Sequence, residues 1–397
     1  MPECYLHCYP PCKQEKLDTP RFLITLDTGI GDAVMVGLSA VDQMVKHDPG
    51  ATGAIDVLCN HIQAQVFAHD PRINRIIETS KIFFPGVHIT QWLRGITLDP
   101  EAADVARFLR QRRYEAIFPS IVAPGLYFRL HSRVMYPHPV EMARHFLAFR
   151  RQSTIQISTV VKGMVNHYFR KTVAIVSEEK GIPLYISSQH VQKARRTMAA
   201  LREKASMEEE HKKVLVIAPD TASAATRPPL DLLIAALSSV LAACPKLIVY
   251  ILPSYTEVTR SSRLLQVLRE SDPDRVFLMP AEPRAHLLEI AALIDQADIF
   301  VTGDTGVMHL AAAYKQLREE EDTCFAPTNS VQIVALFGGT SPNCYGYSRR
   351  STIVGRGRKE QTALRPGFSK EGYNLKGQNL FDHISPQQVA EAILLQL

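Results

Sequence analysis

The segment Val301–Ala313, with the sequence VTGDTGVMHLAAA, carries residue types that suit the binding of an anion. Apolar runs on both sides of its polar centre predict a strand that turns directly into a helix. The first N–H groups of a helix have no partner within the helix, and the helix dipole is positive at that end. Gly303 and Gly306 let a ligand approach the backbone closely, and Thr305 adds a hydroxyl. The corner is therefore predicted to bind a phosphate.

Two more polar side chains belong to this corner. Asp304 is expected to cap the helix or to accept a hydrogen bond from a ligand hydroxyl, because a carboxylate repels a phosphate. His309 follows Thr305 by about one helical turn and adds a hydrogen-bond donor on the same face. The same residues also fit a tightly packed helix start whose histidine is satisfied by protein partners. Both interpretations stand at this point.

A second corner, Leu26–Val34, has the sequence LDTGIGDAV and the same predicted geometry. Thr28, Gly29 and Gly31 form its turn, and Asp32 brings a carboxylate to the start of the next helix. It is not a dinucleotide-binding fingerprint, because Val34 occupies the third glycine position. Asp32 is either a reactive carboxylate or an acid that the helix dipole favours.

The elements around both corners alternate between strand and helix. Strands are predicted at 21–26, 54–59, 72–78, 114–120, 214–219, 247–252, 275–280, 298–303 and 331–338. Helices are predicted at about 33–47, 230–243, 257–270, 285–297 and 306–317. This alternation is typical of α/β proteins with parallel sheets covered by helices on both faces.

The charged run REKASMEEEHKK, residues 202–213, separates two such series and is interpreted as a linker. The predicted organisation is a tail at 1–20, a first domain at 21–205, a second domain at 206–380 and a closing helix at 381–397. Both domains are expected to be doubly wound and Rossmann-like. Ligands of such sheets bind at the carboxyl ends of the strands, so both sets of loops are expected to meet in an interdomain cleft.

Composition limits the class of protein. The chain has 397 residues, of which 46% are hydrophobic and 21% charged, as in a soluble globular protein. Its net charge of +5 fits anionic small molecules or an acidic membrane surface and is too weak to indicate nucleic acid. No apolar run spans a bilayer, no signal-peptide pattern is present, and seven sparse cysteines indicate the reducing cytoplasm. Cys4, Cys8 and Cys12 match no metal-ligand spacing, so a loosely packed tail is expected.

Several ordered motifs together resemble glycosyltransferase family 9, the ADP-heptose:lipopolysaccharide heptosyltransferases and their relatives. The GLGD or SMGD pattern of that family corresponds to Gly29–Asp32, its DSGPMHLAAA begins at Asp304, and its VALFGPTDP corresponds to Val334–Pro342. The segments DPRINRIIE and ISPQQVAEAILLQL are also similar to the family. The resemblance runs from Arg21 to the end of the chain. It implies the GT-B fold: two facing Rossmann-like domains, with the acceptor mainly on the first and the nucleotide-sugar donor mainly on the second.

The resemblance also implies a reaction. It is an inverting, metal-independent transfer of a sugar, such as heptose from ADP-heptose, to a cell-envelope glycan or lipid-linked acceptor, without a cofactor. Asp32 would deprotonate the acceptor hydroxyl, and Thr305 and Gly306 would stabilise the leaving diphosphate with help from His309. Two loop residues are carried over as further donor contacts. Arg227 would clamp a phosphate, with an ordinary surface-loop arginine as the alternative. Glu257 would contact the donor ribose, with an ordinary glutamate of an N-terminal helical turn as the alternative.

The chain departs from the family pattern at several places. Val307 and Gly339 replace prolines, and the segment 315–330 inserts a charged loop. The segment 349–376 carries eight basic residues and is either a solvated loop or a contact with a lipid-linked acceptor at the inner face of the membrane. Two other functions compete with transfer: a catalytically silent nucleotide-sugar-binding GT-B protein, and a GT-B-shaped sugar-nucleotide epimerase. Asp32 argues against the first, and no acid/base set for the second can be assembled from the sequence.

Overall fold

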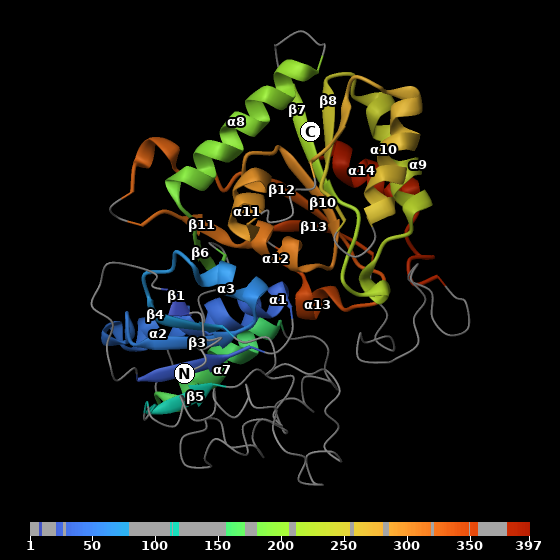
Figure 1. The fold of residues 1–397 in the computed structure, drawn as a ribbon. Coiled ribbons are helices and arrows are strands. Elements are labelled where there is room, and N and C mark those ends of the chain that lie inside the picture. The colour runs from blue at the N-terminus through green and yellow to red at the C-terminus, as the bar shows by residue number, and fades with distance from the viewer. Residues whose placement is uncertain are drawn as a thin grey trace, which may run out of the picture. The chain divides into compact units, whose positions relative to one another are not determined.

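The computed structural model describes residues 8–9, 21–26, 29–78, 112, 114–118, 156–170, 181–205, 212–254, 258–280, 286–318, 321–348, 350–355 and 379–397. The chain divides into two compact units (Figure 1). The first comprises Met1–Ser177, Ile182–Ser187 and Arg318–Glu320, and the second comprises Glu178–Gly181, Ser188–Leu317 and Glu321–Leu397. In the described part of the chain, no helix is both long enough and apolar enough to cross a membrane.

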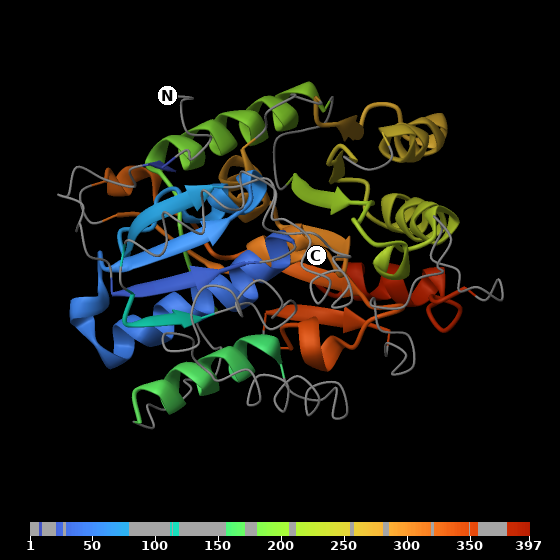
Figure 2. The same ribbon diagram turned by 60° about the horizontal axis from the view of Figure 1, so that its bottom comes forward.

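The first unit is built on a five-stranded sheet in the order β1-β4-β3-β2-β5, shown in blue and cyan in Figure 2. Four of its strands are parallel, and they are β2 (Phe22–Thr25), β3 (Ile55–Cys59), β4 (Ile73–Glu78) and β5 (Ala116–Phe118). The short strand β1 (Cys8–Tyr9) runs antiparallel to β4 at the edge. The described helices of this unit include α1 (Ile30–Asp32), α2 (Ser39–His47), α3 (His61–Phe67) and α7 (Ile157–Tyr168). The 3-10 turn η2 (Pro49–Ala51), strand β6 (Pro183–Tyr185) and a π-helical segment complete the described elements of this unit.

A π-helical segment, η1 (Ala33–Leu38), joins α1 to α2, and all six of its residues are buried. Gly37 lies where this segment meets α3, since a Cβ atom there would approach Cζ of Phe67 to 2.6 Å. The apolar residues of this helical region therefore pack on both the sheet and α3, and α1 is held at the end of β2.

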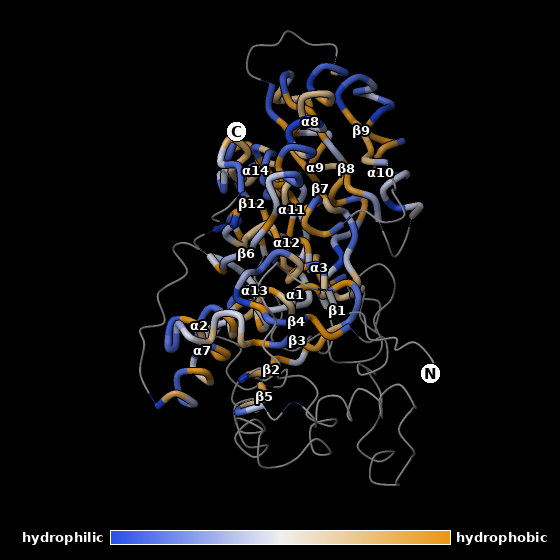
Figure 3. The backbone as a smooth tube through the Cα atoms, turned by 60° about the vertical axis from the view of Figure 1, so that its left-hand side comes forward, coloured by the Kyte–Doolittle hydropathy of each residue, from blue (hydrophilic) through white to orange (hydrophobic). Residues whose placement is uncertain are grey.

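The second unit contains a six-stranded, wholly parallel sheet in the order β13-β12-β10-β7-β8-β9. Its strands are β7 (Lys213–Ala218), β8 (Leu247–Ile251), β9 (Val276–Leu278), β10 (Ile299–Gly303), β12 (Gln332–Leu336) and β13 (Ser351–Val354). Strand order reverses between β7 and β10, as it does in a dinucleotide-binding Rossmann sheet. The strands appear predominantly orange in the hydropathy view, as expected for strands buried on both faces (Figure 3).

Helices cover this second sheet. They are α8 (Ser188–Lys204), α9 (Leu230–Ala243), α10 (Val258–Ser271), α11 (Leu287–Asp295), α12 (Gly306–Ala312), α13 (Pro342–Tyr345) and α14 (Pro386–Leu394). A continuous core joins α9, α10 and α14 to the strands through residues such as Leu237, Leu264 and Ile393. The remaining described elements are β11 (Tyr314–Gln316) and the 3-10 turns η4 (Ala224–Thr226) and η5 (Thr323–Phe325).

The predicted alternation of strands and helices is confirmed in both units, and several boundaries differ from the prediction. The predicted break at residue 205 falls too late, because α8 belongs to the second unit, where Lys193 pairs with Glu289 of α11 at 2.8 Å. The predicted tail contains β1. The helix predicted at 306–317 ends at Ala312, where the backbone becomes extended and leads into β11.

Two segments that differ from the family pattern are partly described. The insertion 315–330 contains the last two residues of β11 and the turn η5. It is tied to α8, because the guanidinium of Arg195 donates to the carbonyl oxygens of Cys324 and Ala326 at 2.8 and 3.0 Å. The basic segment 349–376 contributes β13 to the sheet, so Ser351–Val354 is not a solvated loop. Residues 349 and 356–376 lie outside the described residues, and the expected membrane contact stays a prediction.

Candidate functional site

The corner predicted from Val301–Ala313 lies at the point where the strand order of the second sheet reverses. Strand β10 ends at Gly303, and Thr302 pairs with Ala218 at the end of β7. Loops that follow the two strands on either side of such a reversal diverge and leave a crevice at the carboxyl edge of the sheet. The fold therefore places the predicted anion-binding residues at the position where doubly wound sheets bind their ligands.

Two glycines allow the loop after β7 to pack against the ends of β10 and β12. A Cβ atom on Gly303 would lie 2.5 Å from the carbonyl oxygen of Thr226, and one on Gly339 would lie 2.3 Å from that of Ala225. The N–H of Gly339 donates to the same Ala225 oxygen at 3.1 Å. The proline expected at position 339 from the resemblance has no N–H, so this chain replaces a proline with a residue that ties two loops together.

The helix α12 starts as predicted, with unpaired N–H groups. Thr305 is its N-cap residue, in extended conformation, and its carbonyl oxygen accepts from the N–H of Met308 at 3.0 Å. The side chain of Thr305 does not cap this end, and no described hydrogen bond joins Asp304 to it. Within the described residues, no hydrogen bond satisfies the N–H of Gly306 or Val307. These donors are available to an anion.

Asp304, His309 and Tyr347 form one buried cluster beside this helix end. The Nδ1 atom of His309 lies 2.9 Å from the hydroxyl oxygen of Tyr347, and the two rings pack edge to face at 5.6 Å. The Nε2 atom lies 3.6 Å from Oδ1 of Asp304. Tyr347 was not predicted from the sequence, because it is 38 residues from His309 and no spacing links the two.

Arg227 is buried within the loop after β7, so the alternative of a surface-loop arginine is wrong. Its Nε lies 2.7 Å from Oδ1 of Asp220, and its Nη2 donates to the carbonyl oxygen of Thr221 at 2.8 Å. Arg260 of α10 holds the same loop, since its Nε donates to the carbonyl oxygen of Pro219 at 2.8 Å. Arg227 thus shapes the loop, and its predicted contact with a phosphate stays a prediction.

The corner of the first unit brings Gly29, Gly31 and Asp32 together at the carboxyl end of β2. The N–H of Gly29 donates to Oδ2 of half-buried Asp32 at 3.3 Å, so the carboxylate helps to cap α1. The side-chain amide of Gln63, on α3, donates to the carbonyl oxygen of Gly29 at 3.1 Å. The turn is therefore held from two sides. Thr28 and the predicted donor residue Glu257 lie outside the described residues.

A sequence model of glycosyltransferase family 9 (heptosyltransferase) matches residues 135–373, which is more than half of the chain. The chain belongs to glycosyltransferase family 9. The resemblance seen in the motifs is thereby confirmed, and the protein is a glycosyltransferase. No curated protein matches its sequence.

Solved structures of this family share the fold. ADP-heptose lps heptosyltransferase II of E. coli superposes with a TM-score of 0.61 at 18% identity, over 95% of this chain and 98% of that chain. A family 9 glycosyltransferase of Veillonella parvula DSM 2008 gives 0.61 at 16% identity, over 96% and 98%. E. coli heptosyltransferase WaaC, solved with ADP-2-deoxy-2-fluoro heptose, gives 0.58 at 16% identity, over 95% and 100%. The predicted GT-B fold class is confirmed.

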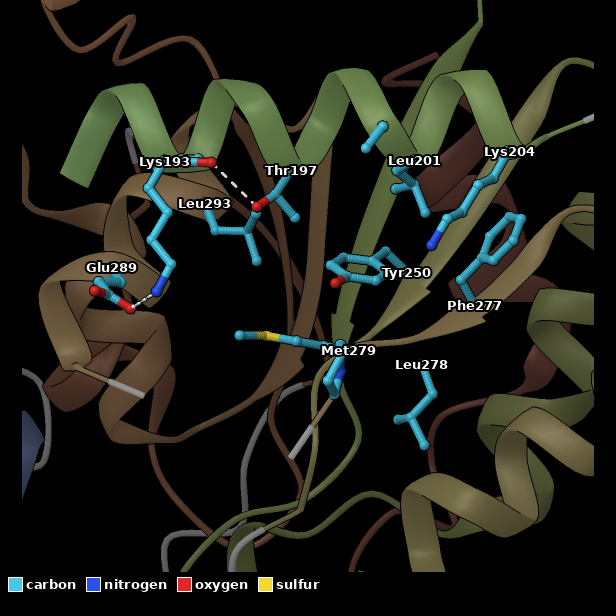
Figure 4. Close-up of a pocket in the computed structure, with 13 residues that line it drawn as sticks. Lys193, Thr197, Leu201, Lys204, Tyr250, Phe277, Leu278, Met279, Glu289 and Leu293 are labelled. Carbon is cyan, nitrogen blue, oxygen red and sulfur yellow. Dashed lines mark hydrogen bonds and ion pairs between the residues drawn. The ribbon is translucent and has the colours of Figure 1, made fainter. Parts of the chain in front are cut away.

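The second unit of this glycosyltransferase also contains a cavity of about 310 Å³ between α8 and strands β8 and β9 (Figure 4). Tyr250, Phe277 and Met279 form its apolar floor, and the side chain of Lys204 reaches toward Phe277. None of the corner residues lines it. The cavity lies on a face of the sheet, and it shares no lining residue with the carboxyl edge. The candidate site is therefore still the segment Val301–Ala313.

The described part of the glycosyltransferase contains no group of three or more His, Cys, Asp or Glu residues arranged to hold a metal ion. Among the three N-terminal cysteines, Cys8 lies in β1, while Cys4 and Cys12 lie outside the described residues.

Proposed function

We propose that this family 9 protein catalyses inverting transfer of a sugar, such as heptose, from a nucleotide-diphosphate donor to a hydroxyl group of a cell-envelope glycan or lipid-linked acceptor. The observation that carries the proposal is the uncapped end of α12 beside Asp304 and His309, at the strand-order reversal of a Rossmann-like sheet. A diphosphate needs donors at such an edge, and the second unit offers them there.

On the donor side, the leaving group gains negative charge as its bond to the sugar breaks. The N–H groups of Gly306 and Val307 and the positive end of α12 would stabilise that charge without moving, which is the most effective form of electrostatic stabilisation. No described hydrogen bond joins Asp304 to this helix end, so its carboxylate is assigned to accept a hydrogen bond from a donor hydroxyl. We further propose that this donor set acts without a metal ion.

On the acceptor side, Asp32 is proposed as the general base. Its carboxylate takes the proton from the acceptor hydroxyl, the acceptor oxygen bonds to the anomeric carbon, and the bond to the diphosphate breaks on the opposite face of the sugar. The hydrogen bond from the Gly29 N–H fixes the carboxylate at the start of α1. Because the base acts in one displacement, the configuration at the anomeric carbon inverts.

The substitution Asp32→Asn tests this role. Asparagine keeps an oxygen that can accept from the Gly29 N–H, so the turn is retained while the base is lost. We expect kcat to fall by a factor of about 10² to 10⁴, the usual contribution of a general base, with nucleotide affinity unchanged. Transfer is followed with a panel of nucleotide sugars, after thermal-shift binding has selected the donor.

The matched control is Asp231→Asn, which changes an exposed aspartate in the first turn of α9. It is expected to leave both turnover and nucleotide binding intact. Undiminished transfer by the Asp32 variant would show that the base is another residue. Binding of a nucleotide sugar without turnover by the unaltered protein would favour a catalytically silent binding protein.

A further inference from the structure

We propose that Tyr347 is a positioning residue that fixes the ring orientation of His309, so that the Nε2–H group, which Asp304 favours, points at Asp304. This inference rests on the proposed function, in which His309 and Asp304 belong to the donor site. It adds a residue that lies outside the family motifs quoted above, between the VALFGGTSP segment and β13.

The first argument is the isolation of the cluster from water. Tyr347 exposes 1% of its surface and His309 4%, so their polar atoms must find partners within the protein. The Tyr347 hydroxyl lies 2.9 Å from Nδ1 of His309, which is a normal hydrogen-bond distance. The Nε2 atom faces Oδ1 of Asp304 at 3.6 Å, which is an electrostatic contact slightly longer than a hydrogen bond.

The second argument concerns which nitrogen of the neutral ring carries the proton. A carboxylate is an acceptor only, and a neutral imidazole has one N–H and one nitrogen lone pair. A lone pair on Nε2 would face the negative oxygen of Asp304, whereas an N–H there is attracted to it. Nδ1 must then hold the lone pair, and the Tyr347 hydroxyl donates to it. The cluster therefore selects the tautomer protonated at Nε2.

The third argument is the rigidity of both partners. The carbonyl oxygen of Tyr347 accepts from the N–H groups of Arg350 and Ser351, both at 2.8 Å, and from the Ser351 hydroxyl at 2.9 Å. On the other side, the carbonyl oxygen of His309 accepts from the N–H of Ala313 at 3.0 Å within α12. The imidazole is thus attached to one hydrogen-bonded backbone, that of His309, and contacts a side chain from a second one, that of Tyr347. Such a preset N–H dipole beside Asp304 needs no reorientation when a donor binds.

Nitrogen NMR of the full chain, labelled with ¹⁵N in its histidine rings, tests the inference once the pH has been raised until the rings show the signals of neutral imidazole. The His309 signals are identified by their loss in His309→Gln. We expect Nε2 to be protonated and Nδ1 to show the shift of a hydrogen-bonded lone-pair nitrogen. In Tyr347→Phe, the Nδ1 signal should move to that of a lone-pair nitrogen without a donor, while Asp304 keeps Nε2 protonated.

The control Tyr314→Phe removes a half-buried hydroxyl elsewhere in the second unit and should leave the His309 signals in place. In transfer assays, Tyr347→Phe should lower kcat about threefold to tenfold, as expected for the loss of one hydrogen bond. A proton on Nδ1 in the unaltered protein would overturn the inference, and that measurement requires no variant to fold. Unchanged signals or unchanged kcat in Tyr347→Phe would also overturn it. If no donor supports transfer, the proposed function fails, while the NMR result still decides the tautomer.

Discussion

Lys315 is a lysine with an unusual environment, because its side chain is buried and its ammonium donates to the carbonyl oxygen of Ala311 at the end of α12. Burial disfavours the charged form and lowers the pKa of Lys315 to about 8, although Asp295 opposes this effect. Arg350, a like charge, lowers it further. In an unfolded chain the pKa returns to about 10.5, so unfolding takes up a proton between these two values.

Lys315 should therefore lower the free energy of unfolding by an amount that depends on pH. At pH values above 10.5, Lys315 is neutral in both the folded and the unfolded chain, so its burial does not lower the free energy of unfolding. As the pH falls to about 8, the unfolded chain becomes charged first, and this lowering grows. Near pH 7, Lys315→Met should raise the free energy of unfolding by up to about 3 kcal/mol. The contribution of the lost hydrogen bond to Ala311 is subtracted from this gain. Urea unfolding between pH 7 and pH 10.5 measures this difference, which should shrink as pH rises above about 8. A constant difference would contradict the assignment.

Residue types and spacing predicted only part of the site. The types and spacing of Asp304, Thr305 and His309 predicted a site, and the fold places them at the strand-order reversal. The partners that complete the site, Tyr347 for His309 and Asp220 for Arg227, depend on which loops meet in space. A hydrogen-bond partner from another loop leaves no periodic signal in the sequence.

At the scale of elements, the strands and helices with clear apolar periodicity were predictable, and the helix α9 matches its predicted bounds of 230–243. The helix expected to reach residue 317 ends early because the Asn329 side chain binds the backbone N–H and carbonyl of Lys315, at 2.8 and 2.9 Å, and favours a strand. The strand β13 was missed because its basic flanks resemble a loop. The π-helical segment was missed because an apolar run gives no sign of the hydrogen-bond spacing.

The start of α12 can be tested by two neighbouring proline substitutions. Proline is favoured in the first turn of a helix, and extended Thr305 is compatible with a following proline. Gly306→Pro removes an N–H assigned to the diphosphate and should weaken nucleotide binding about tenfold. Val307→Pro removes the other N–H assigned to the diphosphate and should weaken nucleotide binding as well, whereas the control Asp231→Asn should leave the affinity unchanged. Calorimetric titration with ADP measures all three. Equal affinity of the Gly306 variant and the unaltered protein would contradict the role of this helix end.

The close contact between Gly339, after β12, and Ala225, after β7, predicts that a single added methyl group has a strong effect on stability. Gly339→Ala places a Cβ atom 2.3 Å from the Ala225 oxygen and should destabilise the second unit by about 1–3 kcal/mol. The control is Gly163→Ala within α7, where a Cβ atom would have no neighbour within 4 Å. That substitution should stabilise the first unit by about 0.5–1 kcal/mol. Thermal unfolding compares the two variants, and a harmless Gly339→Ala would show that the loops separate easily.

At the scale of the whole molecule, the chain consists of two compact units that each have their own sheet. The proposed roles divide along the same line, with the base Asp32 in the first unit and the donor corner in the second. A chain of about 400 residues is expected to form separate cores in this way. The fold class could therefore be predicted from the sequence. The boundary between the two units could not, because α8 packs with the second unit although most of it precedes the charged run 202–213.

This division predicts where a nucleotide protects the backbone. Hydrogen exchange followed by mass spectrometry, with and without saturating ADP, should show slower exchange in 219–229 and 303–309. Strands β3 and β4 of the first unit should exchange at an unchanged rate. Protection confined to the first unit, or absent from the loops of the second, would place nucleotide binding elsewhere.

The π-helical segment begins directly after Asp32, at Ala33. A π turn holds one residue more than an α turn, so the loss of a single residue from Ala33–Leu38 would restore regular winding. Each residue rotates a helix by about 100°. Such a deletion would therefore rotate α1, which carries the carboxylate of Asp32, around the helix axis, while the sheet would stay unchanged. Deletion of one buried residue would therefore re-aim this acid without altering the acid itself.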